Sequence, residues 1–375
     1  MSEGAAASGA EDLPGIRRDA VERFFATHVP GGAGPLQFSL ISGGRSNITY
    51  RVDGPGGTWV LRRPPLGHVL PTAHDMAREY RVIAALGGTD VPVARAIALC
   101  EDTTVNDAPF YVMGHVEGVV LETKLPPGFA ETEAERARIG DALVATLAKL
   151  HAVDFRAIGL ADFGRPEGYI ERQVRRWAQQ WERSKTGPLP GIEELARRLA
   201  AALPNSPAPT LVHGDYRLGN LALDPRDPGR IAAIFDWEMA TLGDPLADLG
   251  YTLIYWTEPE QSEGGERARG ERSDPGDRAS GSPFGASITA QPGFATRAQL
   301  VEAYARATGR DVAAIDYYQV LALYKLAVIS EGIYARVQMG KTLGPGFENM
   351  QRAAGPLAER ALALADQSSD ARLRG

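Results

Sequence analysis

The sequence of 375 residues contains a single cysteine, Cys100, and only six histidines. One thiol cannot form an internal disulfide, and the scattered histidines do not provide a zinc-type set of ligands. No apolar run reaches the roughly 18 residues that a membrane-spanning helix requires. The first residues also lack the basic start and apolar stretch of a signal peptide. These absences predict a cytoplasmic protein without a membrane partner.

An excess of basic charge is also missing, because 40 lysines and arginines stand against 47 aspartates and glutamates and the net charge is -7. Nucleic-acid binding usually requires a basic face, so this balance argues against a nucleic-acid partner. With 44% hydrophobic residues, the chain can bury the core of one large two-lobed unit or of two domains. The composition is typical of an ordinary soluble enzyme.

Three segments contain few apolar residues and are expected to be disordered or frayed. They are the small and acidic residues 1–14, a polar insert at 257–292, and the polar end of the chain at 368–375. The insert is either a lid or a tolerated insertion, and its composition does not choose between the two.

The most informative stretch is HGDYRLGN at 213–220, followed by IFDWE at 234–238. Apolar runs at 210–212 and 230–235 predict two short strands that deliver these polar residues. Transfer of a γ-phosphoryl group requires positioning and charge neutralisation. Asp215 would orient or accept the proton of the attacking hydroxyl, and Asn220 and Asp236 would offer the oxygen ligands that Mg²⁺ prefers. The alternative, that these are turn or cap residues, leaves their joint spacing unexplained.

HGDxxxxN together with a strand-borne aspartate resembles the motif of the aminoglycoside phosphotransferase and choline kinase-like superfamily. The resemblance extends over roughly residues 36–350 without the insert. It implies an α+β, bilobal, protein-kinase-like fold with a small β-rich N-lobe at 15–113 and a larger, mainly helical C-lobe at 114–367. ATP would bind in the cleft between the lobes. LRRPP at 61–65 and REYR at 78–81 resemble one branch, the kinase-like domains fused to certain acyl-CoA dehydrogenases.

A glycine-containing turn, SGGRSN at 42–47, precedes a strand predicted at 49–52, which should pair with another at 59–62. Gly43, Gly44, Ser46 and Asn47 would cover the phosphates of ATP, because successive backbone amides can form a concave anion site. An ordinary turn is the alternative interpretation.

The kinase scheme also requires a cation on the following strand, paired with a helical glutamate. Arg62 occupies this place, where most kinases have lysine, and its planar guanidinium is not equivalent to an ammonium. In the branch that the chain resembles, an arginine here is normal. Glu79, in a helix predicted at 73–86, is the expected partner of Arg62, with a solvated helix charge as the alternative.

The segment after an apolar strand at 110–113 resembles the hinge between kinase lobes. Backbone groups of Met113, Gly114, His115 and Val116 would hydrogen-bond the adenine edge of ATP. His115 itself is predicted to be a hinge or surface residue, with a catalytic histidine as the less favoured alternative.

Several residues of the C-lobe are expected to support the site. Thr132 and Glu135 predict a capping box at the start of a long helix. Asp248 is expected to accept hydrogen bonds from the catalytic loop, and Asp244 to cap the helix that follows it. His151 resembles a family fingerprint and is predicted to be structural.

Residues that could contact the acceptor are predicted from their positions in the resembling fold. They are Arg217, Glu238, Tyr324, Glu331 and Tyr334. A helix at 173–185, rich in arginine and tryptophan, either binds an anionic substrate or buries its tryptophans while its arginines face solvent.

These patterns predict a small-molecule kinase that transfers the γ-phosphoryl group of ATP to a hydroxyl group with the help of Mg²⁺. The C-lobe shows no cluster of acids that would match aminoglycoside amines, and the branch resemblance favours a hydroxy acid or its CoA thioester. A nucleotide-binding pseudokinase or regulatory module is the alternative, suggested by Arg62 and the insert. Against it stands the intact set of Asp215, Asn220 and Asp236. An interaction protein would leave this set unexplained.

Overall fold

The structure is a computed structural model, and it describes residues 13–42, 47–66, 74–122, 124–189, 191–258, 288–339 and 351–375. Gly43, Gly44 and Ser46 of the predicted phosphate-covering turn lie outside the described residues. The chain forms two compact units. Unit 1 comprises the residues up to Gly87 together with Ala94–His115, and unit 2 comprises Gly88–Val93 together with Val116–Gly375.

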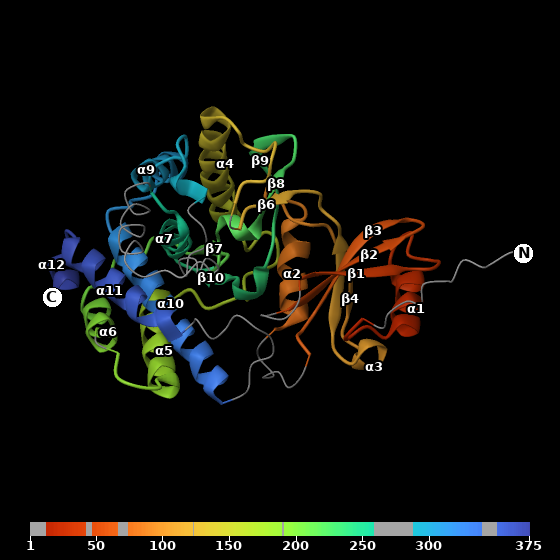
Figure 1. Ribbon diagram of the computed structural model, residues 1–375, viewed down its shortest axis with the longest axis horizontal. Coiled ribbons are helices and arrows are strands. Elements are labelled where there is room, and N and C mark those ends of the chain that lie inside the picture. The colour runs from red at the N-terminus through yellow and green to blue at the C-terminus, as the bar shows by residue number, and fades with distance from the viewer. Residues whose placement is uncertain are drawn as a thin grey trace, which may run out of the picture. The chain divides into compact units, whose positions relative to one another are not determined.

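Unit 1 is built on an antiparallel five-stranded sheet in the order β1-β2-β3-β5-β4 (Figure 1). The β2–β3 hairpin, in which Gly54 pairs with Gly57, confirms the pairing predicted for 49–52 and 59–62. The elements of unit 1 are α1 (Arg18–His28), β1 (Gln37–Ser42), β2 (Ile48–Gly54), β3 (Gly57–Arg63), α2 (Met76–Leu86), β4 (Ala96–Cys100), α3 (Thr103–Asn106) and β5 (Phe110–Gly114).

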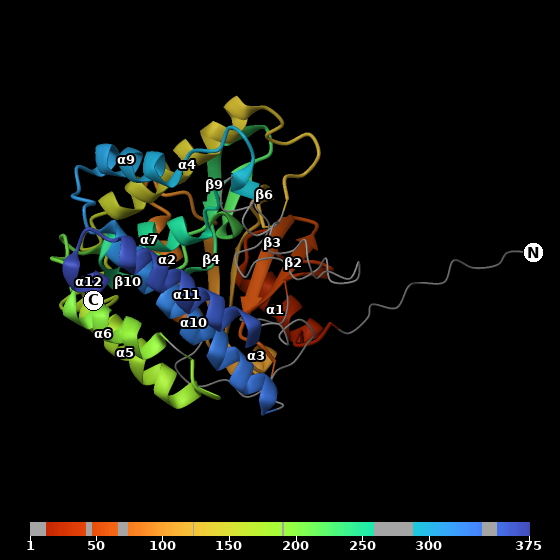
Figure 2. The same cartoon turned by 60° about the vertical axis from the view of Figure 1, so that its left-hand side comes forward.

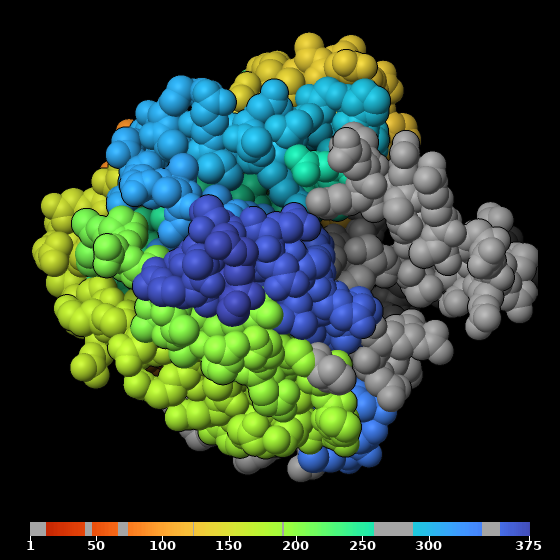
Figure 3. Space-filling model, turned by 90° about the vertical axis from the view of Figure 1, so that its left-hand side faces the viewer, coloured from red at the N-terminus to blue at the C-terminus, as the bar shows by residue number. Residues whose placement is uncertain are grey.

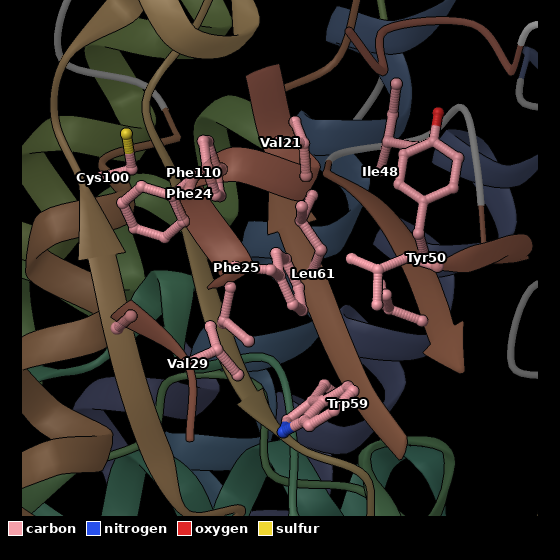
Figure 4. Packing of buried hydrophobic residues seen from close by; sticks show 14 residues of the cluster. Val21, Phe24, Phe25, Val29, Ile48, Tyr50, Trp59, Leu61, Cys100 and Phe110 are labelled. Atoms are coloured by element: carbon pink, nitrogen blue, oxygen red, sulfur yellow. The ribbon is translucent and has the colours of Figure 1, made fainter. Parts of the chain in front are cut away.

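Helix α1 supplies the apolar side of the unit 1 core. Its residues Val21 and Phe25 are buried against Trp59 and Leu61 of β3, as Figure 4 shows. The rings of Phe25 and Trp59 meet edge to face, with their centroids 5.8 Å apart. Because successive strand residues point to opposite faces of a sheet, Arg62 lies on the face opposite to Leu61.

Helix α2 packs on strands β4 and β5. It begins at Met76, later than predicted, because Asp75 caps its N-terminus by accepting the N–H of Arg78 at 2.9 Å. A side-chain cap of this kind satisfies one of the N–H groups that a first turn leaves unpaired. Met76, Ile83 and Leu86 form the apolar stripe of this helix, and all three are buried.

Unit 2 contains two small antiparallel sheets, one pairing β7 with β10 and the other in the order β6-β8-β9. The predicted strands at 210–212 and 230–235 are confirmed as β7 and β9. Their C-terminal ends lead into the two halves of the predicted catalytic motif. The strands are β6 (Val119–Val120), β7 (Thr210–Val212), β8 (Leu221–Asp224), β9 (Asp227–Ile234) and β10 (Thr241–Gly243).

The remainder of unit 2 is mainly helical, and α10 packs on α5, α6, α7 and α11 (Figure 2). The small antiparallel sheet of unit 1 and the helices of unit 2 confirm the predicted α+β class. In the described ranges, no helix combines the length and the apolarity needed to cross a bilayer. The helices are α4 (Glu133–Ala152), α5 (Tyr169–Ser184), α6 (Ile192–Ala201), α7 (Pro245–Tyr255), α9 (Arg297–Thr308), α10 (Ile315–Gln338), α11 (Gln351–Gln367) and α12 (Ala371–Arg374).

Side-chain caps define where two helices near the motif begin. Thr132 Oγ1 accepts the N–H of Glu135 at 3.2 Å, and the Glu135 carboxylate accepts the N–H of Thr132 at 2.9 Å. This reciprocal pair confirms the predicted capping box of α4. Asp244 caps α7, as predicted, by accepting the N–H of Leu246 at 3.0 Å.

The C-terminal residues, predicted to fray, are instead folded onto unit 2. Residues 371–374 form α12, Leu373 is fully buried, and Arg374 donates to the carbonyl oxygen of Ser368. Figure 3 shows α11 and α12 lying against the segment that contains α5 and α6. The prediction was wrong because Leu373 packs against α6 and α11 and thereby orders an otherwise polar segment.

The predicted insert is also folded at both of its ends. Ile288 and Thr289 are buried, and Thr289 Oγ1 accepts the N–H of Thr257 at 2.8 Å. The boundaries 257 and 292 were therefore wrong, because a buried isoleucine and a hydrogen-bonded threonine order residues at each end. Residues 259–287 lie outside the described residues.

Candidate active site

The predicted catalytic loop, residues 213–220, follows the buried strand β7 and ends in a short 3₁₀ helix, Leu218–Asn220. Gly214 has a φ of +84°, and a Cβ atom on it would lie 2.8 Å from the carbonyl oxygen of Met239. Glycine alone adopts such a backbone readily, and here it also avoids a clash. The loop therefore requires glycine at the centre of its HGD sequence.

Asp215 is held from two sides. Its Oδ2 accepts a hydrogen bond of 2.7 Å from Asn220 Nδ2, which also donates to the main-chain oxygen of Asp215 at 2.8 Å. Its Oδ1 accepts the Nε–H of Arg217 at 3.3 Å, and the Asp215 side chain remains 20% exposed. The carboxylate is thus fixed in direction yet reachable by a hydroxyl group.

Asp236 lies two residues after the end of β9 and has a left-handed backbone, φ +64° and ψ +61°. Non-glycine residues rarely adopt this conformation, and they cluster at functional sites. The preceding Phe235 donates its N–H to the Asn220 carbonyl at 2.8 Å, and its own carbonyl accepts the Nε2–H of His213 at 2.8 Å. These bonds bring the backbone of Asp236 beside the loop that carries Asp215 and Asn220.

The donor set of this arrangement fits Mg²⁺. The Asn220 amide nitrogen faces Asp215, which leaves its amide oxygen for a cation, and Asp236 supplies a carboxylate. Mg²⁺ is commonly held by one or two carboxylates together with substrate phosphates. Among the residues that the structure describes, no group of three or more His, Cys, Asp or Glu could hold a metal ion. One carboxylate and one amide oxygen suit an ion that nucleotide phosphates also bind.

Asp248 of α7 binds the catalytic loop through its backbone. Its carboxylate accepts the N–H of His213 at 2.6 Å and that of Gly214 at 2.7 Å, which confirms the predicted hydrogen bonds. It also contacts His151 Nε2 at 3.2 Å, and His151 Nδ1 lies 2.7 Å from the Tyr304 hydroxyl. Burial by itself would raise the pKa of Asp248, but its bonds with His151 and His213 hold that pKa below its ordinary value.

Asp248→Asn is expected to reduce the free energy of unfolding by roughly 1–3 kcal/mol, the penalty for a buried N–H group that loses its acceptor. The reason is that an amide has one acceptor oxygen for the two N–H groups that Asp248 now binds. Urea unfolding at pH 7 measures the change, because a lowered folded pKa keeps this stabilisation complete above the unfolded value of about 3.9. Asp141→Asn, on the exposed side of α4, is the matched control. Equal loss in both variants would contradict the role of Asp248.

Comparison with known proteins supports what the geometry indicates. Residues 37–284 match the phosphotransferase enzyme family. The chain belongs to this family. It is 33% identical over 357 residues to acyl-CoA dehydrogenase family member 11 of Gallus gallus, covering 93% of the chain and 43% of that protein. It is 32% identical over 333 residues to member 10 of Mus musculus, covering 87% and 29%. The chain therefore spans less than half the length of these relatives, and the resemblance seen in the sequence is confirmed.

Solved structures agree with the fold of this chain. A candidate aminoglycoside phosphotransferase from Ralstonia eutropha matches with a TM-score of 0.77 and 35% identity, covering 94% of this chain and 99% of that one. A ternary complex of aminoglycoside phosphotransferase APH(4)-Ia with ADP and hygromycin B matches with a TM-score of 0.57 and 13% identity, covering 94% and 99%. At that identity the second likeness shows the fold alone.

Unit 1 contains the predicted pair of Arg62 and Glu79. Arg62 Nε donates to Glu79 Oε2 at 3.1 Å, and Arg62 Nη1 donates to Thr49 Oγ1 at 3.3 Å. The Glu79 side chain is 1% exposed, so the alternative of a solvated helix charge was wrong. Helix α2 therefore lies on the face of the sheet to which Arg62 points, and Leu61 points to the opposite face.

The predicted hinge residues make hydrogen bonds inside unit 1. The N–H of Gly114 is donated to Arg95 O at 2.9 Å, and the N–H of His115 to Thr58 O at 3.4 Å. An adenine contact through these two N–H groups would require both bonds to open. Met113 and Asn47, two further candidates, are buried.

The predicted acceptor residues differ in how accessible they are. Glu238 is half-buried in the 3₁₀ helix that follows Asp236. On α10, Tyr324 is fully buried, Glu331 accepts the N–H and hydroxyl of Thr186 at 2.7 Å, and the Tyr334 hydroxyl accepts from Gln338. Their acceptor roles remain predictions, and Tyr324 could reach a ligand only if the core opened.

The arginine- and tryptophan-rich helix corresponds to α5. Trp177 and Trp181 are buried, whereas Arg175, Arg176 and Arg183 are exposed. This pattern favours the second interpretation, in which the helix buries its tryptophans and its arginines face solvent.

Sequence reasoning missed a cation beside the loop. Lys325 Nζ, from α10, donates to the carbonyl oxygen of Gly214 at 3.0 Å across 111 residues of sequence. No local signal could have found it, because a lysine in a helix has no pattern that marks a partner so far away in the sequence.

A pocket in unit 2 adjoins the catalytic loop. It is linked to Asp215 through Arg217, whose guanidinium lies 5.3 Å from the centre of the Tyr255 ring. Glu122 is the one acid among the lining residues that the structure describes. The pocket is lined by Leu121, Glu122, Leu143, Arg217, Leu218, Gly219, Thr252, Tyr255, Trp256, Ile288 and Thr289.

Proposed function

We propose that this phosphotransferase transfers the γ-phosphoryl group of ATP to a hydroxyl group of a small molecule. The observation that carries the proposal is the assembly of Asp215, Asn220 and the Asp236 backbone at the ends of β7 and β9. Phosphoryl transfer requires this combination of a carboxylate that receives a proton and oxygen ligands for a metal.

Asp215 acts as the general base in this proposal. Its carboxylate is aimed by the amide of Asn220 and by Arg217, so it can accept the proton of the acceptor hydroxyl as that oxygen attacks. Asn220 and Asp236 would hold Mg²⁺, which when bound neutralises charge on the phosphates. The positive charge of Arg217 would stabilise the negative charge that the reacting groups carry.

Residues of unit 1 would contact the nucleotide. Arg62 keeps its guanidinium in one orientation through Glu79 and Thr49, and an oriented guanidinium can bind a phosphate with two donors. The ADP complex of APH(4)-Ia supports nucleotide binding by the fold. Asn47 and the carbonyl groups near Gly114 remain further candidates for this role.

The pocket beside Arg217 supports an acceptor that combines an apolar chain with an anionic group, such as a hydroxy acid or its CoA thioester. Leu121, Leu143, Trp256 and Ile288 offer apolar contacts, and Arg217 offers a cation. An aminoglycoside carries several amines and would be expected to need several acids. Among the lining residues that the structure describes, Glu122 is the one acid, and this favours a hydroxy acid over an aminoglycoside.

In a screen with MgATP, ADP release is expected with hydroxy acids or their CoA thioesters. Their kcat/KM should be at least about tenfold above that with hygromycin B. A buried charge without a partner costs roughly 1–3 kcal/mol or more, and about 1.4 kcal/mol corresponds to a tenfold difference. A coupled ADP assay measures the rates, and the same screen with Asp215→Asn shows whether the release comes from this site. A preference for hygromycin B would contradict the acceptor class. No release with any hydroxyl compound would favour the regulatory, nucleotide-binding alternative.

A further inference from the structure

Gly214 is held at both of its backbone polar groups by side chains distant in sequence. Its N–H is bound by Asp248 Oδ1 at 2.7 Å, and its carbonyl oxygen accepts the Lys325 ammonium at 3.0 Å. That carbonyl belongs to the peptide group whose nitrogen is the amide of Asp215. The orientation of this peptide sets the direction in which the Asp215 side chain leaves the backbone.

The ammonium of Lys325 is confined by aromatic rings from two other helices. It lies 4.5 Å from the ring centre of Tyr251 on α7 and 5.9 Å from that of Trp177 on α5. Cations within about 6 Å of an aromatic ring are attracted to its face. The rings therefore limit the movement of the ammonium and keep it directed at the loop, although Lys325 comes from α10.

Lys325 is half-buried, and an ammonium would be an unfavourable group to withdraw from water here if packing were its only purpose. Desolvation of a charge costs free energy that a single hydrogen bond does not fully return, and a methionine of similar length would fill the space between Trp177 and Tyr251. The charge of Lys325 is explained if its hydrogen bond to the Gly214 carbonyl serves the catalytic loop.

We propose that Lys325 is a positioning residue for Asp215, whose ammonium fixes the Gly214–Asp215 peptide and thereby the direction of the carboxylate. This role rests on the proposed function, in which Asp215 acts on the acceptor hydroxyl. Asp248 fixes the His213–Gly214 peptide through its N–H and Lys325 fixes the Gly214–Asp215 peptide through its carbonyl, so the two residues hold consecutive peptides of the loop.

Titration of Lys325 provides a readout that a packing role would not change. Burial lowers the pKa of Lys325, Asp215 of the loop and Asp248 of α7 oppose this, and Arg176 of α5 adds to it. Tyr251 presents its ring face to the ammonium. Because the charged form is the active one, activity should fall as the pH rises through the Lys325 pKa.

The experiment compares Lys325→Met and Lys325→Arg with the wild type and with Lys149→Met, a control on the exposed side of α4. Lys325→Met is expected to lower kcat by about 10- to 100-fold, the scale of a catalytic group that is misplaced by about 1 Å. Its KM for ATP should change less than about threefold, and its thermal unfolding should stay close to that of the wild type, because removal of a desolvated charge offsets the lost hydrogen bond.

Lys325→Arg is expected to recover part of kcat and to move the alkaline limb of the pH profile upward, because a guanidinium keeps its proton above pH 12. A kcat of Lys325→Met within twofold of the wild type would overturn the proposal. The proposal would also be overturned if kcat fell equally in all variants and in proportion to their loss of thermal stability.

Hydrogen exchange of the peptides that contain residues 213–220 tests the same idea without an acceptor. Faster exchange is expected in Lys325→Met but not in Lys149→Met, and unchanged exchange in Lys325→Met would overturn the positioning role. A wild-type protein that transfers no phosphoryl group would count against the proposed function, whereas an active wild type with an equally active Lys325→Met would count against Lys325 alone.

Discussion

Asp215→Asn is expected to lower phosphoryl transfer by about 10²-fold or more, the usual scale for a positioned base, while leaving the affinity for MgATP nearly unchanged. The amide oxygen of an asparagine can still accept the Asn220 Nδ2–H now bound at 2.7 Å, so the loop should keep its shape. What is lost is the negative charge that attracts the hydroxyl proton and pairs with Arg217.

Steady-state ADP release and nucleotide-induced thermal stabilisation measure the two halves of this prediction on the same protein. Asp311→Asn is the matched control, because Asp311 is exposed and accepts a local N–H that an asparagine can also accept. If Asp215→Asn turned over like the wild type, Asp215 would not be the base. If the variant lost MgATP binding as well, Asp215 would belong to the nucleotide site.

Asp236→Asn is expected to abolish the magnesium-dependent part of nucleotide binding. Wild-type protein at a MgATP concentration about 100 times Kd should gain roughly 2.7 kcal/mol in free energy of unfolding. With MgATP, the variant should gain no more than the wild type gains from ATP in the presence of a chelator. Asparagine is the informative replacement, because Asp236 has φ +64° and asparagine tolerates a left-handed backbone that strains alanine. Asp236→Ala should lose the same binding and additional stability.

Thermal unfolding with ATP and Mg²⁺, with ATP and a chelator, and without ligand separates these contributions. Magnesium dependence equal to that of the wild type in both variants would remove Asp236 from the metal site. Absence of any stabilisation in the wild type, with ATP or with GTP, would instead question the nucleotide site as a whole.

Signals close together in the sequence predicted much of this fold. The β7 and β9 strands follow from short apolar runs, and the capping box of α4 follows from Thr132 and Glu135. Such features are predictable because each depends on residues within one turn or one strand. The pair of Arg62 and Glu79 needed the family resemblance, since no rule of spacing links a strand to a later helix.

Burial of single residues in otherwise polar segments was not predictable. Leu373 and Ile288 order segments whose composition indicated disorder, because docking depends on the surface that other helices present. The same limit applied to the hinge, where the N–H groups of Gly114 and His115 bond to residues about 20 and 60 positions earlier in the chain.

The sequence by itself determined which groups can do the chemistry. The spacing from Asp215 to Asn220 and on to Asp236 is short, and the two strands that deliver them lie within a single stretch of about 25 residues. Tertiary structure alone decided how the backbone around Asp215 is held. The N–H groups of the loop are bound by Asp248, 34 and 35 residues away, and its carbonyl by Lys325, 111 residues away. Hydrogen bonds of this kind act over about 3 Å, so they exist only once α7 and α10 have packed beside the loop.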